Sequence, residues 1–238
     1  HLSIRRQRQM CIRDRFDREL QHLQDEVLVL GSLVENAIIE SVELLKRRDT
    51  EGARRLIRED RRVINEKRFA IESEALTLIA TQQPMAGDLR IIAAVIEIAH
   101  ELERMGDYAK GIAKINVMMG DEPLLKPLID VPLMAEKGRD MLHRALEAFV
   151  NRDVELARAI PKEDDEVDNL YNQVYRELLS MMMENPRDID RATYLLWVAH
   201  NLERTADRVA NICERVIFMV TGEFVEMDVD DPTPAGIR

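Results

Sequence analysis

The chain has 238 residues, of which 33% are charged and only 4% are aromatic. Such a composition is typical of long amphipathic helices and leaves little material for sheets. The formal net charge of −11 argues against nucleic acid and against an anionic membrane surface as direct partners. Two cysteines, Cys11 and Cys213, are too few for a disulfide framework, so we expect a reduced, cytosolic compartment.

The predicted elements of the first half begin after an arginine-rich head. Residues 1–15 show no clean helical period, and we interpret them as a non-native head outside the fold. In residues 16–120, apolar side chains recur at three- and four-residue steps, which is the period of an amphipathic helix. Thr50 is the expected N-cap of the second helix, and Pro84 ends that helix. The helices predicted for this first bundle cover residues 16–48, 50–81 and 85–120.

The second half repeats this plan after a proline-containing linker, residues 121–131. Residues 132–222 are expected to form a second three-helix bundle, and Pro161 is expected to kink its middle helix. Residues 223–238 are acidic, contain proline and lack a period, so we expect a disordered tail. The helices predicted for the second bundle cover residues 132–150, 153–185 and 186–221.

One nine-residue motif occurs in both halves. Residues 99–107 read AHELERMGD and residues 199–207 read AHNLERTAD, with six identical residues at the same places. Residues 48–54 and 152–158 resemble each other as well. The sequence therefore predicts an all-α fold of six long helices, arranged as two tandem homologous three-helix bundles. It leaves open whether the bundles lie side by side or end to end.

Each copy of the motif places two carboxylates four residues apart. The pairs are Glu103 with Asp107 and Glu203 with Asp207. On a helix such residues share a face, with Cβ atoms roughly 5–6 Å apart, and two like charges this close weaken the helix. A bound cation would compensate, and oxygen ligands suit iron, Mn²⁺, Mg²⁺ or Ca²⁺ better than Zn²⁺. These four residues are therefore candidate metal ligands, and a solvated acidic face is the alternative interpretation.

An enzymatic interpretation has less support in the sequence. Glu97 and His100 match the Glu-x-x-His pattern of di-iron carboxylate bundles, but Trp197 stands where the second repeat needs the matching Glu. We interpret His100 and His200 as surface or supporting residues, Trp197 as a packing anchor and Cys213 as an inert core residue. A carboxylate-bridged metalloenzyme is thus the alternative to a non-enzymatic protein.

Several segments together resemble a known family. They are the two Leu-Glu-Arg-x-x-Asp copies, each late in a three-helix repeat, and residues 80–90 (ATQQPMAGDLR), 164–168 (DDEVD) and 196–199 (LWVA). From Phe16 to about Glu223, the chain resembles the PhoU family of phosphate-transport accessory and regulatory proteins. The resemblance implies an all-helical, usually dimeric, cytoplasmic protein without enzymatic activity, which negatively regulates phosphate uptake and the phosphate-starvation response.

The resemblance also implies partners and a cofactor. The implied partners are the ATPase of the phosphate ABC transporter and a sensor histidine kinase, through which the protein is peripheral at the inner membrane. The family's metal signature, associated with iron and other divalent ions in multinuclear clusters, falls on the four carboxylates named above. Gly111 stands where an asparagine like Asn211 is common, and Arg61 stands where an acidic residue like Asp164 is usual. These departures imply a weaker or differently occupied first site.

Overall fold

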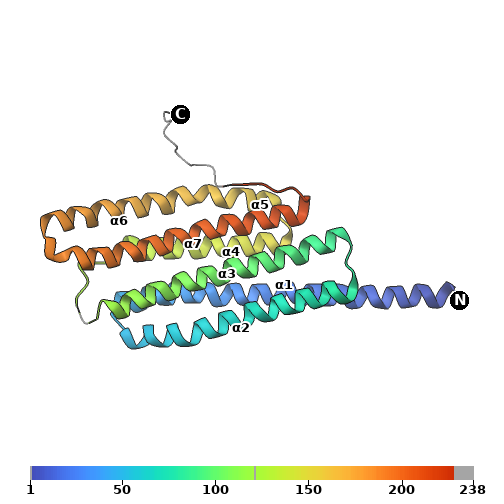
Figure 1. Cartoon of the computed structure of the whole chain (residues 1–238). Helices are drawn as coiled ribbons and strands as arrows, with labels where there is room; N and C mark the ends of the chain where they lie inside the picture. The colour runs from blue at the N-terminus through green and yellow to red at the C-terminus, as the bar shows by residue number, and fades with distance from the viewer. Residues whose placement is uncertain (1, 121, 228–238) are drawn as a thin grey trace, which may run out of the picture.

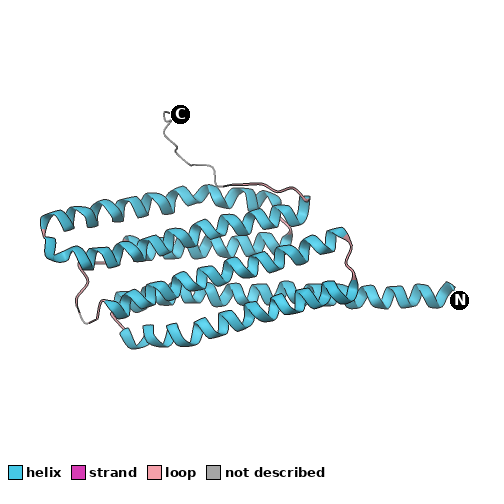
Figure 2. Cartoon of the chain, viewed as in Figure 1, coloured by secondary structure: helices cyan, strands magenta, loops and turns pink. Residues whose placement is uncertain are grey.

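In residues 2–120 and 122–227, the part of the chain that the computed structural model describes, all regular structure is helical (Figure 2). Side chains are described within these ranges except at residues 2–12, 60 and 61. The helices are α1 (Leu2–Arg47), α2 (Thr50–Gln82), α3 (Ala86–Met118), α4 (Asp130–Asn151), α5 (Val154–Ala159), α6 (Asp164–Glu184) and α7 (Ile189–Thr221), with 3₁₀ turns η1 (Ile160–Glu163) and η2 (Pro186–Asp188).

The two predicted bundles lie side by side (Figure 1). Helices α1 to α3 form the first bundle and α4 to α7 the second, and α3 packs against α7 while α1 packs against α4. One continuous cluster of buried apolar side chains runs through both bundles. The end-to-end alternative is therefore excluded, and the two repeats share a single core.

The periodicity of the sequence predicts this core correctly. In α1, every apolar residue of the predicted stripe is at most 6% exposed. Burying such a stripe, rather than intrinsic helix propensity, provides most of the stability of a helix in a protein. The stripe consists of Leu20, Leu23, Val27, Leu30, Val34, Ile38 and Leu45.

The contact between α3 and α7 reflects the duplication. These two helices run in opposite directions (Figure 1), and Glu101 of α3 accepts a hydrogen bond from Asn211 Nδ2 of α7 at 3.2 Å. At the equivalent place, a Cβ added to Gly111 would lie 3.0 Å from Asn201 Oδ1. Gly111, which departs from the family pattern, therefore leaves room for the side chain of the facing repeat.

The turns between the first and second helices of each bundle also match. Asp49 caps α2, because its side chain accepts a hydrogen bond from Gly52 N at 2.7 Å. Asp153 caps α5 in the same way, by accepting a hydrogen bond from Leu156 N at 2.9 Å. The prediction of Thr50 as the N-cap was wrong by one residue, because Thr50 is already inside the helix. A carboxylate one position earlier meets the free amide groups of the first turn.

Three predicted boundaries differ from the structure. Helix α1 begins at Leu2 rather than Phe16, and its first part extends past the neighbouring helices (Figure 1). Arginine and glutamine are good helix formers, and extending an existing helix requires no new nucleus. The interpretation of residues 1–15 as non-native stays a prediction. Helix α4 begins at Asp130, before Pro132, because proline is tolerated in a first turn.

The third difference concerns the tail. Residues 223–227 lie against α7: Phe224 stacks on Phe218 with ring centroids 4.2 Å apart, and Met227 N donates to Glu214 Oε1 at 2.8 Å. The expected disorder is therefore wrong for these five residues, and residues 228–238 lie outside the described part. The predicted kink at Pro161 is confirmed, since η1 separates α5 from α6. Among the described residues, none of the helices combines the length and apolarity that crossing a membrane requires.

Candidate metal-binding site

The four candidate ligands form two separate sites, one in each bundle. Glu103 and Asp107 are on α3, which packs against both α1 and α2 of the first bundle. Glu203 and Asp207 occupy the equivalent places on α7, which packs against both α4 and α6 of the second bundle. The outer helix of each bundle can therefore offer further ligands to the acidic pair beside it.

In the second repeat, Glu203 is a half-buried carboxylate with little compensation. Its side chain is 23% exposed, and Oε2 accepts no hydrogen bond from any described residue. His200 Nδ1 lies 3.2 Å from that oxygen without hydrogen-bond geometry. Burial, then the charges of Asp207 and Asp168, raise the pKa of Glu203 to about 7, although Arg204 opposes this. The charge of Arg204 therefore compensates the Glu203 carboxylate only in part.

Helix α6 contributes further oxygen atoms to this place. Asp168 has a raised pKa because of burial and then the charge of Asp165, and its own charge acts on Glu203. The pKa of Tyr171 is also raised, by burial and then by Glu203. Carboxylates from two packed helices thus act on one another here, and oxygen atoms of this kind are the ligands that a hard cation prefers. The ligands predicted from the sequence did not include Asp168, although the repeat in the sequence already pairs Asp168 with Asn65.

The first repeat has a different environment. Lys110 Nζ donates to Asp107 Oδ1 at 2.8 Å, and the Lys110 side chain is only 10% exposed whereas that of Asp107 is 47% exposed. His100 does not approach Glu103 by any described contact; its Nε2 lies 3.5 Å from Arg68 Nη1 of α2. The motif is therefore repeated, but its electrostatic surroundings are not.

The comparison with known proteins agrees with this duplicated arrangement. A family model described as the PhoU domain matches residues 27–115 and again residues 131–216, which are the two bundles. This chain belongs to the PhoU domain family. The PhoU repeats each end in the helix that carries an acidic pair, α3 in the first and α7 in the second.

Individual PhoU proteins match over nearly the whole chain. A phosphate-specific transport system accessory protein PhoU homolog of Clostridium acetobutylicum is 35% identical, covering 90% of this chain and 97% of the relative. A PhoU homolog of Aquifex aeolicus with the same name is 37% identical, covering 88% of this chain and 94% of the relative. The crystal structure of PhoU from Streptococcus pneumoniae, a phosphate transport system regulatory protein, matches with a TM-score of 0.82 and 32% identity, covering 89% of this chain and 100% of that one. The crystal structure of PhoU from Pseudomonas aeruginosa matches with a TM-score of 0.81 and 32% identity, covering 87% of this chain and 100% of that one.

The divalent metal ion that the family resemblance implies would need oxygen ligands, and these can be sought among the side chains of the second repeat. Within the described residues, no three histidine, cysteine or acidic side chains already converge as a metal cage. The donors of α6 and α7 nevertheless fit a hard divalent cation, because they are oxygen atoms and one of them is buried without a hydrogen bond. Glu203, Asp207 and Asp168 are the residues that would hold the ion, with water completing its coordination.

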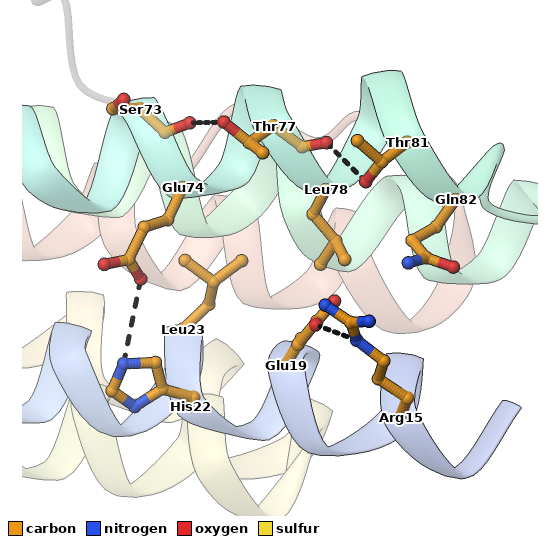
Figure 3. Close-up of a pocket in the computed structure, with 10 residues that line it drawn as sticks. All are labelled: Arg15, Glu19, His22, Leu23, Ser73, Glu74, Thr77, Leu78, Thr81 and Gln82. Atoms are coloured by element: carbon orange, nitrogen blue, oxygen red, sulfur yellow. Dashed lines mark hydrogen bonds and ion pairs between the residues drawn. The ribbon is translucent and has the colours of Figure 1, made fainter. Parts of the chain in front are cut away.

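A groove between α1 and α2 is a weaker candidate (Figure 3). Its volume is about 540 Å³, but its charged groups pair with one another: Arg15 Nε donates to Glu19 at 2.7 Å, and His22 lies 3.8 Å from Glu74. The Thr77 hydroxyl donates to the backbone of its own helix at 2.7 Å. The groove therefore offers a ligand few groups that are not already engaged.

The features of the enzymatic alternative do not converge. Glu97 is exposed on α3, and Trp197, at the equivalent place on α7, is 47% exposed and contacts Tyr194 edge to face. Trp197, interpreted from the sequence as a packing anchor, thus packs on Tyr194 at the surface and not in the core. Cys213 is buried as predicted, and burial raises the pKa of its thiol to about 12, which makes it a poor nucleophile.

Proposed function

We propose that this chain is a cytoplasmic, non-enzymatic negative regulator of phosphate uptake and of the phosphate-starvation response. The observation that carries the proposal is the match of both bundles to the PhoU domain, along with relatives named as accessory proteins of phosphate-specific transport. Its partners are then the ATPase of a phosphate ABC transporter and the cytoplasmic part of a sensor histidine kinase, and it acts as a homodimer. Peripheral association with the inner membrane follows through these partners.

The second part of the proposal is a divalent cation on the carboxylates of the second repeat. Support comes from the buried, unbonded Oε2 of Glu203 and from the proximity of Asp168 on another helix. Oxygen ligands suit iron, Mn²⁺ or Mg²⁺, singly or in a multinuclear cluster, better than Zn²⁺. A cation there would neutralise the acidic groups of α6 and α7 and hold the two helices in one relative position.

Such a cation would affect the surface offered to a partner. Helix α6 is the outer helix of the second bundle (Figure 1), and its position depends on how strongly Asp168 repels Glu203. A cation that removes this repulsion would favour one arrangement of α6 against α7. A partner that prefers this arrangement would then bind more tightly. Metal binding and partner binding are thus thermodynamically linked.

The proposal is tested by capture of purified partners on the immobilised chain. The partners are the transporter ATPase and the cytoplasmic domain of the kinase, each offered with Mn²⁺ and with a chelator. We expect capture of both, strengthened by Mn²⁺ in the wild type and not in the double variant Glu203→Gln, Asp207→Asn. The exposed Asp17→Asn variant is the control. Failure to capture either partner contradicts the regulatory role, and phosphate-ester hydrolysis with Mn²⁺ supports the metalloenzyme instead.

A further inference from the structure

Three arginine side chains, which we call the arginine cluster, gather where α3 packs against α7. These two helices lie side by side and join the two repeats (Figure 1). Arg104 is on α3, whereas Arg204 and Arg208 are on α7. Arg104 and Arg204 are the equivalent arginines of the repeated motif, but Arg208 stands where the first repeat has Tyr108. The arginine cluster therefore combines side chains from both repeats.

Two side chains of α3, Glu101 and Tyr108, hold these arginines in place. Arg104 Nη1 donates to Glu101 Oε1 at 3.3 Å, and Arg208 Nη1 donates to Glu101 Oε2 at 3.4 Å across the helix contact. Arg208 Nε also donates to the Tyr108 hydroxyl at 3.3 Å, and Arg204 Cζ lies 4.8 Å from the centroid of the Tyr108 ring. One carboxylate and one phenol ring thus bring three guanidinium groups together.

Most hydrogen-bond donors of Arg104 and Arg204 are not engaged by the described part of the chain. A guanidinium group has five N–H donors. The side chain of Arg104 is 55% exposed and makes one hydrogen bond to a described residue, Glu101. Arg204 donates no hydrogen bond to any described residue and is only partly buried. These donors can therefore bind a ligand that arrives from solvent.

The acidic pairs of the motif lower the local positive charge but leave these donors unoccupied. Glu103 and Glu203 each precede the motif arginine by one residue, and one residue turns a side chain by about 100° around the axis of an α-helix. The charge of Arg204 acts on Glu203, although no ion pair joins the two described side chains. Asp107 accepts a hydrogen bond from Lys110. The arginine donors thus remain available at the contact between α3 and α7.

Such a set of donors suits a small oxyanion, and Glu101 makes it selective. A guanidinium group can donate two parallel hydrogen bonds to a phosphate group, and charge-assisted bonds of this kind are stronger than neutral ones. A carboxylate has about four acceptor sites. Three of those on Glu101 are used, by Arg104, Arg208 and Asn211. The remaining site can accept the hydrogen of a hydrogen phosphate ion, whereas sulfate has no hydrogen to donate and is repelled by the carboxylate.

We propose that the arginine cluster binds inorganic phosphate as its protonated dianion. The three guanidinium groups donate hydrogen bonds to the phosphate oxygens, and Glu101 accepts the phosphate hydrogen. The inference rests on the proposed function, since regulation of phosphate uptake supplies phosphate as the ligand, and it deepens that function by placing the ion on the regulator itself. Because the cluster joins both repeats, bound phosphate stabilises the folded arrangement of α3 against α7.

The test is calorimetric titration of the full chain with inorganic phosphate at neutral pH and low ionic strength. Metal is first removed on a chelating resin, so that phosphate cannot bind through a cation. We expect saturable binding, weakened about tenfold or more in Arg104→Gln and in Arg204→Gln, because each variant loses charge-assisted hydrogen bonds. The matched control is Arg54→Gln, at an exposed position of α2 without a described ion pair, and it is expected to bind phosphate like the wild type. Circular dichroism confirms that each variant remains helical.

Titration with sulfate tests the role of Glu101. The wild type is expected to bind phosphate at least about tenfold more tightly than sulfate, and Glu101→Gln is expected to lose this preference. Equal affinity of the wild type for the two anions would overturn the assignment to phosphate. The inference is also overturned if the wild type binds no phosphate, or if Arg54→Gln weakens binding as much as Arg104→Gln does. The capture of the transporter ATPase and the kinase tests the regulatory role independently.

Discussion

Replacing Glu203 by glutamine is expected to stabilise the metal-free protein at alkaline pH. The carboxylate is half-buried, its Oε2 accepts no hydrogen bond from described residues, and Asp168 and Asp207 add negative charge. Glutamine has nearly the same shape and carries no charge. The substitution therefore removes the repulsion without creating a cavity.

The magnitude follows from the pKa of Glu203, which is about 7 in the folded protein instead of the ordinary 4.5. A carboxyl group with a raised pKa favours the folded state only while it is protonated. Its contribution is complete below pH 4.5 and is lost as the pH rises through about 7. The loss amounts to about 3 kcal/mol as an upper figure, since each pKa unit corresponds to roughly 1.4 kcal/mol. Glu203→Gln avoids this loss.

The assay is urea unfolding at 25 °C in a chelator, comparing the free energy of unfolding at pH 4.5 and at pH 8. We expect Glu203→Gln to gain up to about 3 kcal/mol over the wild type at pH 8 and almost nothing at pH 4.5. The matched control is Glu103→Gln, where Lys110 is on the same helical face and a smaller gain is expected. A Glu203→Gln variant no more stable than the wild type at pH 8 would refute the argument that an uncompensated charge is buried there.

Two further predictions concern the N-caps of α2 and α5 and the contact between α3 and α7. Replacing the N-caps Asp49 and Asp153 by alanine, one at a time, is expected to lower the free energy of unfolding by about 1 kcal/mol each, measured by urea unfolding. Glu101→Ala is expected to lower it by about 3 kcal/mol, because Arg208, 3.4 Å away across the α3–α7 contact, would lose its anionic partner. A loss below about 0.5 kcal/mol in the Glu101 variant would show that this pair does not join the repeats.

Helix positions were predictable because they depend on local patterns. The stripe from Leu20 to Leu45 has the helical period and is buried throughout, and proline and glycine mark most of the breaks. The relative placement of the bundles was not predictable, because it depends on which two surfaces fit. Contacts such as that between Gly111 and Asn201 join residues far apart in the chain, and only the folded structure brings them together.

The equivalence of the two acidic pairs was predictable from the sequence, but their electrostatic surroundings were not. The repeated motif identified Glu103 and Glu203 as equivalent, and the structure has them on α3 and α7. Whether each carboxylate has a cationic neighbour depends on side-chain position. The 2.8 Å hydrogen bond from Lys110 to Asp107 and the effect of Asp168 on the pKa of Glu203 both depend on the folded structure. The lysine and the aspartate were readable in the sequence, but their effect on the pairs was not.

Two carboxylates on one helical face can be relieved by a fixed ammonium group, by a proton or by a metal ion. In the first repeat Lys110 donates to Asp107. In the second repeat Arg204 offsets part of the charge on Glu203, and a proton and the proposed metal ion would compete for that carboxylate. Because its pKa is about 7, metal must displace a proton below that pH. Mn²⁺ affinity is therefore expected to rise about tenfold between pH 6 and pH 8 and to level off above it. Calorimetry in buffers of different ionisation enthalpy measures both the affinity and the proton released. An affinity that is independent of pH in this range would mean that Glu203 is not a ligand.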